Sequence, residues 1–162
     1  MSAWADWWRR LFVVERDSGR RPRSQRPVSL RGVVQPLESL RSPVSGEECV
    51  SIRLTAMAPA AFGTLLGGVT RHDTACWELA EFLLQGAEGT ILVRASRPAS
   101  VERFHAELVA RHGVDLEWHE VLIRSGDEVL VTGRVVEHHD GAPHRRQPYR
   151  LVVAATAVDT AR

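Results

Sequence analysis

The stretch that decides the fold lies at residues 31–53 and reads RGVVQPLESLRSPVSGEECVSIR. A short strand is expected to end at Val34, because Pro36 favours a turn soon after it. A second strand is expected to begin at Cys49. A matching piece lies far downstream at residues 120–133, EVLIRSGDEVLVTG, where a Gly-Asp turn separates two apolar runs. Together the two pieces predict the first and last parts of one small β-barrel.

The remaining pattern predicts a mainly β protein with one helix in its body. Val50, Ile52 and Leu54 alternate with polar residues, which predicts a strand with one buried face. A helix is expected at residues 98–112, with Ser100 as its N-cap. The other expected strands lie at residues 28–34, 75–84, 90–95, 116–123, 128–137 and 149–158. This order favours an OB-like β-barrel with one inserted α-helix, and a mixed α+β sandwich is the competing architecture.

The N-terminal region differs from this body. Residues 1–14 have helical spacing that places Trp4, Trp7, Trp8 and Leu11 on one face, which predicts an amphipathic helix. Residues 15–27 contain five Arg and two Pro with almost no apolar side chain, and they are expected to form a flexible linker. The domain itself is expected at residues 28–158, followed by a short tail at 159–162.

Charge and cysteine content limit the classes of function. Residues 1–27 hold seven Arg and three acidic residues, a charge of +4, so the net +1 of the chain leaves −3 for the rest. An acidic body is poorly suited to a phosphate backbone. The two cysteines form no CxxC pair, and no apolar stretch approaches the roughly 20 residues of a membrane span. No signal peptide is expected either. We expect a cytoplasmic protein that could also associate peripherally with the inner face of the membrane.

The two pieces quoted first resemble a known family. Residues 32–37, GVVQPL, residues 40–53 and the E..L..GD.V.V.G pattern of residues 120–133 are similar to the GIDE-type (MULAN-type) "beside a membrane" domain, found in a mitochondrial ubiquitin ligase and in bacterial and archaeal proteins. Trp77 and residues 82–93 resemble the middle hairpin of that domain. The resemblance covers about residues 28–158. It implies a non-catalytic module that stands beside a membrane and binds a protein partner. Because a RING motif and membrane spans are missing from these 162 residues, ubiquitin transfer is not implied.

Several polar residues could carry chemistry, but each also has a structural explanation. His138, His139 and His144 could ligate a divalent ion, although the Asp-Gly turn between them is typical of an exposed hairpin tip. Cys49 and Cys76, the latter near His72 and Asp73, could act as nucleophiles, although free cysteine is usually a small buried apolar residue. We expect no cofactor and no small-molecule substrate.

Three further pairs or sets of residues are interpreted in the same way. His105 and His112 share a face of the expected helix, where two ligands without a third do not make a metal site. Trp77 and Trp118 are expected to be core or barrel-rim aromatic residues.

The function that the sequence favours is an interaction or adaptor module without catalysis. Its Trp-rich helix would recruit it to a protein partner or to an anionic membrane surface, or would fold back onto the domain. The expected contacts are the anchors Trp4, Trp7, Trp8 and Leu11, with Arg9, Arg10, Arg20, Arg21 and Arg23 as their electrostatic partners. An OB-fold binder of single-stranded nucleic acid and a metal- or Cys-dependent enzyme remain the alternatives.

Overall fold

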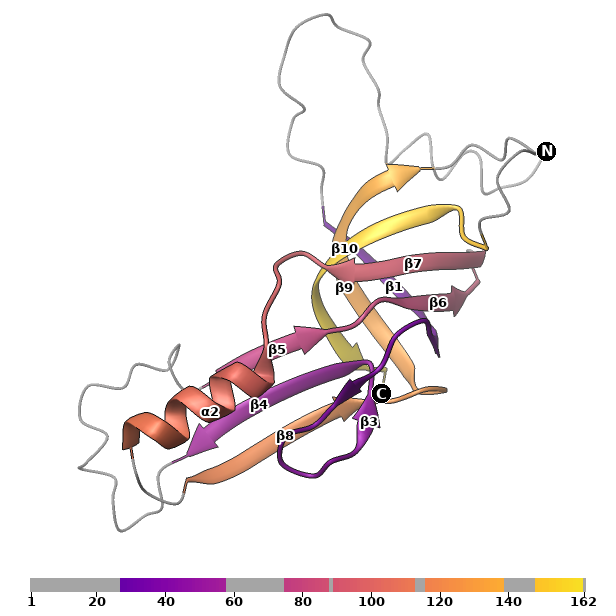
Figure 1. Cartoon of the computed structure of the whole chain (residues 1–162). Helices are drawn as coiled ribbons and strands as arrows, with labels where there is room; N and C mark the ends of the chain where they lie inside the picture. Colours follow the sequence, from indigo (N-terminus) through magenta and orange to yellow (C-terminus); the bar gives the residue numbers. More distant parts are fainter. Residues whose placement is uncertain (1–26, 58–74, 88, 113–115, 139–147, 162) are drawn as a thin grey trace, which may run out of the picture.

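Ten strands and one helix make up the part of the chain that the computed structural model describes, residues 27–57, 75–87, 89–112, 116–138 and 148–161 (Figure 1). A small barrel with one inserted helix is therefore confirmed for these residues. The elements are β1 (Val28–Pro36), β2 (Leu40–Arg41), β3 (Glu48–Cys49), β4 (Ser51–Met57), β5 (Ala75–Leu79), β6 (Phe82–Gly86), β7 (Gly89–Ala95), α2 (Val101–His112), β8 (Glu117–Ile123), β9 (Glu128–His138) and β10 (Leu151–Thr160).

Five of the strands close into a barrel in the order β1-β6-β7-β10-β9. Strand β1 closes the ring by pairing antiparallel with both β6 and β9, and β10 runs parallel to β7. The interior is apolar, with side chains such as Phe82, Leu84 and Val129 fully buried. Closure leaves these strands with a hydrogen-bonded neighbour on each side.

Glycines stand where two barrel strands approach too closely for a side chain. A Cβ on Gly32 of β1 would lie 2.6 Å from the carbonyl oxygen of Gln85 in β6. A Cβ on Gly133 of β9 would lie 2.9 Å from the Cα of Ala155 in β10. The turn between β8 and β9 needs a third glycine, because Gly126 has a φ of 83°, in the left-handed region that glycine adopts without strain. These contacts give a physical reason for the glycines at both ends of the sequence pattern.

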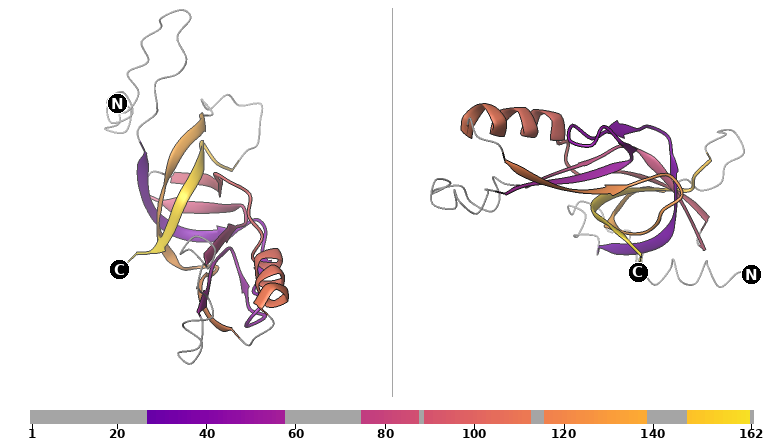
Figure 2. Two further views of the ribbon diagram at one scale, coloured as in Figure 1. Left: turned by 90° about the vertical axis from the view of Figure 1, so that its left-hand side faces the viewer. Right: turned by 90° about the horizontal axis from the view of Figure 1, so that it is seen from below.

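The second layer is a three-stranded sheet in the order β5-β4-β8, and α2 covers one of its faces. A small core forms between them from Cys49, Ile52, Leu54 and Val101, with Phe104 and Trp118 packed against it. The rings of Phe104 and Trp118 meet edge to face, with centroids 6.3 Å apart. The inserted helix thus packs on this sheet, and Figure 2 shows it to one side of the barrel.

The N-terminus of α2 is held by two side chains. The predicted N-cap is confirmed, since the amide of Arg103 donates to Ser100 Oγ at 3.3 Å. The amide of Val101 donates to Glu78 Oε2 at 2.7 Å, so a carboxylate of β5 also accepts from the first turn. A negative charge at this end is favourable because free amides and the helix dipole both point toward it. The helix begins at Val101, three residues later than predicted.

The predicted single buried face of residues 49–55 is wrong. Val50 lies in the barrel core, whereas Ile52 and Leu54 lie in the core under α2. The reason is a break between β3 and β4 at Val50, whose amide donates to the carbonyl of Ile123 at 2.8 Å. The chain passes there from the barrel to the sheet, so the identity of the buried face changes.

The predicted strand at residues 75–84 is also two strands, with a break at Ala80 and Glu81. The amide of Ala80 donates to the carbonyl of Val50 at 2.8 Å, so both breaks lie at the same junction between barrel and sheet. Strand β10 continues to Thr160, beyond the predicted end at residue 158, because Asp159 and Thr160 still pair with β9.

Candidate functional surfaces

Most of the predicted contact residues lie outside the described part of the chain. This holds for the whole Trp-rich segment and the linker arginines, that is Trp4, Trp7, Trp8, Arg9, Arg10, Leu11, Arg20, Arg21 and Arg23. It also holds for His139 and His144, while His138 is the last residue of β9. Among the described residues, no group of three or more His, Cys, Asp or Glu side chains is placed to hold a metal ion.

Both thiols are held in their protonated form by the fold. Cys49 is 3% exposed, and its thiol donates to the carbonyl of Leu40 at 3.8 Å. Burial raises the pKa of Cys49 from its ordinary 9.0 to about 11, and nearby carboxylates add to the rise while Arg124 opposes it. Burial, together with Glu78, also raises the pKa of Cys76. A nucleophilic thiol needs the opposite shift, so these cysteines are suited to packing.

The aromatic and helix residues singled out in the sequence have structural contacts. Trp118 packs under α2, where the ring of His105 lies 4.6 Å from it between centroids. Trp77 is half-buried against the barrel core, and its Nε1 donates to Ser51 Oγ at 2.8 Å. Both tryptophans are therefore packing residues, as predicted, although Trp77 also borders an uncovered surface.

That surface is the face of the β5-β4-β8 sheet opposite α2, which we call the open face. Side chains on it alternate with those that point toward the helix. Its central row joins Trp77, Arg53 and Val121, which are direct partners across the three strands. Outer rows pair Thr55 with His119 and Met57 with Glu117. Met57 and Val121 are 47% and 43% exposed. Since α2 is the one helix among the described residues, none of the described helical structure covers this face.

A pocket of about 260 Å³ lies where the open face meets the end of β10, and we call it the corner pocket. Its apolar wall comes from Val121 and Ile123 of β8 and from Val158 of β10. Its polar side is an ion pair in which Arg53 Nη2 lies 3.2 Å from Asp159 Oδ1, with Thr160 next to it. In the right-hand view of Figure 2, α2 and the C-terminal end of β10 lie on opposite sides of the sheet.

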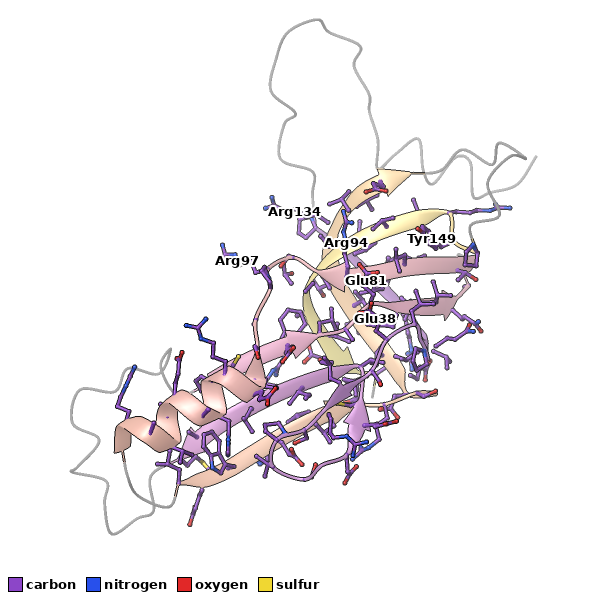
Figure 3. The ribbon with its side chains drawn as sticks, viewed as in Figure 1. Glu38, Glu81, Arg94, Arg97, Arg134 and Tyr149 are labelled. Carbon is purple, nitrogen blue, oxygen red and sulfur yellow. The ribbon has the colours of Figure 1, made fainter. Side chains whose placement is uncertain are left out.

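A second surface lies on the outside of the barrel, where charged residues form a row across the strands. Ala154 of β10 pairs with Arg94 of β7 on one side and with Arg134 of β9 on the other. Arg97 follows the end of β7. We call Arg94, Ala154, Arg134 and Arg97 the arginine row. Figure 3 shows the three arginines with Glu38, Glu81 and Tyr149 on one side of the molecule.

Sequence reasoning missed both surfaces, although each left a signal. Arg94 and Arg134 interrupt apolar runs, ILVRA and VTGRVV, which indicates that their side chains point out of the barrel. That the two meet across Ala154 depends on strand register and order, because β7 and β10 are parallel neighbours far apart in sequence. The same reason hides the Arg53–Asp159 pair.

Comparisons with protein-family models, with curated proteins and with solved structures found no match to this chain. Within the described residues, no helix combines the length and apolar character that crossing a bilayer requires. The functional argument therefore rests on the surfaces described above.

Proposed function

We propose that this chain is a non-catalytic interaction module that binds a protein partner. In this proposal residues 1–27 recruit the module through Trp4, Trp7 and Trp8, and the body contributes the open face and the corner pocket. Aromatic anchors inserted into a partner commonly supply most of the binding energy of such contacts. The resemblance to the GIDE-type domain belongs to the same proposal, since it also implies a partner-binding module.

The observation that carries the proposal is the uncovered open face beside the corner pocket. A sheet normally buries one face against a helix or another sheet and keeps a polar face toward water. Here the outer face holds exposed Val121 and Met57 beside Trp77, with an apolar-walled pocket at its edge. Apolar residues gathered in this way favour a protein contact more than a solvated surface.

The state of the thiols and the charge of the body support binding over the two alternatives. The raised pKa values of Cys49 and Cys76 leave little thiolate near neutral pH, which disfavours a nucleophilic enzyme. The charge of −3 over residues 28–162 disfavours a module that binds single-stranded nucleic acid, because such modules rely on a basic groove.

The proposal is tested by comparing four full-length proteins in affinity pull-downs from a lysate and in sedimentation with anionic phospholipid vesicles. These are the wild type, the Trp4→Ala/Trp7→Ala/Trp8→Ala variant, Val121→Glu, and Val109→Glu as a control. Val109 on α2 is as exposed as Val121, 43%, but lies away from the open face. We expect a saturable set of captured proteins that the triple variant and Val121→Glu lose and the control retains.

Three results would contradict the proposal. Unchanged capture by the triple variant would remove the role of the N-terminal segment. Equal behaviour of Val121→Glu and Val109→Glu would remove the role of the open face. Trp-dependent sedimentation with vesicles, without Trp-dependent protein capture, would assign the segment to a membrane surface instead of a protein.

A further inference from the structure

The arginine row presents three guanidinium groups around a small side chain. Arg94 and Arg134 flank Ala154 at the same level of the barrel, so their Cα atoms are about 10 Å apart, two strand spacings. Alanine does not rise between them, so both side chains border the space above it. Arg97 is exposed and lies three residues beyond Arg94, where the amide of Ser96 still donates to the carbonyl of Ala155 at 3.0 Å.

These guanidinium groups keep donors that their neighbours do not use. Within the described residues, neither Arg97 nor Arg134 forms an ion pair. Arg94 has one partner, Glu137, at 3.3 Å between Nη2 and Oε1. A guanidinium carries five N–H donors, so this single contact leaves Arg94 able to bind a further acceptor. The row therefore offers a concentration of positive charge in a body that is acidic as a whole.

The charge on this side of the barrel is ordered from acidic to basic. Glu81 precedes Phe82, whose partner Val93 precedes Arg94, so Glu81 extends the same level across β6. The amide of Glu38 donates to the carbonyl of Glu81 at 3.2 Å, which adds a second carboxylate there. In Figure 3, Glu38 and Glu81 lie below the arginines. Two carboxylates at one end would repel a long uniform polyanion that followed the row.

Apolar side chains lie one level along the strands from the charged row. Leu83, Leu92 and Val152 face outward from three neighbouring strands, and they form a cluster of their own with Tyr149. A ligand that follows the charged row therefore passes beside apolar surface. Such a neighbourhood suits a polypeptide, whose side chains can alternate between charged and apolar, more than a phosphate polymer.

We propose that Arg94, Arg97 and Arg134 bind carboxylates of an acidic segment in a protein partner. This inference rests on the proposed function and names the chemistry of the partner. Guanidinium and carboxylate groups form paired, charge-assisted hydrogen bonds whose planar geometry gives specificity as well as energy. Arg134 and Arg97 supply the unpaired groups, and Arg94 joins them across Ala154.

The test uses a labelled nonapeptide with three aspartates separated by leucines, and a matched peptide in which asparagine replaces each aspartate. Binding is followed by fluorescence anisotropy with the full-length wild type and with Arg97→Gln/Arg134→Gln. Arg103→Gln/Arg111→Gln, on the exposed side of α2, is the control with the same loss of charge. We expect the wild type to bind the acidic peptide, about tenfold or more weaker in the row variant, since one such contact is worth at least that factor. The control should bind as the wild type does.

Labelled oligothymidylate and phosphatidylserine vesicles serve as competing anions. Arg97- and Arg134-dependent binding to either one that is tighter than binding to the acidic peptide would overturn the choice of a carboxylate ligand. An equal loss in the control variant would show a net-charge effect, and equal binding of the asparagine peptide would remove the charge contact. Absence of peptide binding by the wild type would also overturn the inference.

The Trp4→Ala/Trp7→Ala/Trp8→Ala variant separates this inference from the proposed function. It should bind the acidic peptide as the wild type does, because the arginine row is intact. If recruitment depends on the tryptophans while the row variant binds the peptide normally, the inference about the row is wrong and the proposed function stands.

Discussion

The barrel and the three-stranded sheet are made from consecutive stretches of one chain, yet they bury their apolar residues in different ways. The barrel closes on itself, so Phe82 and its neighbours are buried on all sides. The sheet is open and depends on α2 to cover Ile52 and Leu54. Because only one helix is available to it in the described chain, its second face remains accessible. Closure thus supplies stability, and the open sheet supplies binding surface.

The two regions meet at a junction crossed three times by the chain. Val50, the Ala80–Glu81 break and the turn after Ile123 all lie there. Hydrogen bonds from Val50 to Ile123 and from Ala80 to Val50 join the three crossings. The sheet is therefore attached to the barrel by backbone pairing, and loss of its own core can be partial. The predictions below test this unequal dependence.

The largest effect is expected from truncating a phenylalanine in the barrel. Phe82→Ala should lower the free energy of unfolding by about 3–5 kcal/mol, because it opens a cavity among residues that cannot collapse. Phe104→Ala, under α2, should cost only about 1–2 kcal/mol, since that ring is half-buried. Urea unfolding measures both values. Native-state hydrogen exchange should show loss of protection throughout for Phe82→Ala, and only in α2 and the sheet for Phe104→Ala. Equal costs would break the comparison between the two regions.

A smaller effect is expected when pH is raised. The folded-state pKa of Cys49 is about 11 against an ordinary 9.0, so above pH 9 the unfolded chain loses a proton that the native protein keeps. The stability from this thiol is complete below pH 9 and is lost as pH rises toward 11, by at most about 2–3 kcal/mol. Urea unfolding between pH 8 and 11 measures it. Because the chain has no lysine and one tyrosine, few other groups titrate in this window.

Cys49→Ala is the control for that pH series. The substitution lowers stability at every pH, but it should flatten the slope between pH 9 and 11. A slope that is as steep in Cys49→Ala as in the wild type would assign the pH dependence to other groups, of which Cys76 is the first candidate because its pKa is also raised.

The smallest effect is expected at the attachment of α2. Glu78→Ala removes the acceptor of the Val101 amide and should cost about 1–2 kcal/mol, the usual range for a capping or charged hydrogen bond. Hydrogen exchange in the first turn of α2 should speed up while the barrel amides are unaffected. Glu102→Ala, at an exposed acidic residue of the same turn, is the control and should change stability by less. Equal losses in the two variants would show that the cap contributes nothing beyond helix charge.

Much of the fold followed from local pattern. Alternation located the strands of the barrel, Ser100 marked the start of the helix within a residue, and the Gly-Asp turn at 126–127 separated β8 from β9. Such features depend on neighbouring residues and on backbone sterics, so they can be read without knowing the partner strands. The one buried face assigned to Val50, Ile52 and Leu54 failed because alternation reports burial without reporting which core receives the side chain.

The candidate surfaces required the tertiary structure. Arg94, Ala154 and Arg134 become neighbours only through the parallel pairing of β7 with β10 and the antiparallel pairing of β10 with β9. Arg53 and Asp159 likewise meet from strands more than a hundred residues apart. Residue order specified the strand-forming segments, the turns and the helix start, because those are short-range preferences. The choice of which strands pair, and in which register, is made by the burial of two separate cores, and that choice alone places the charged and apolar side chains that a partner would meet.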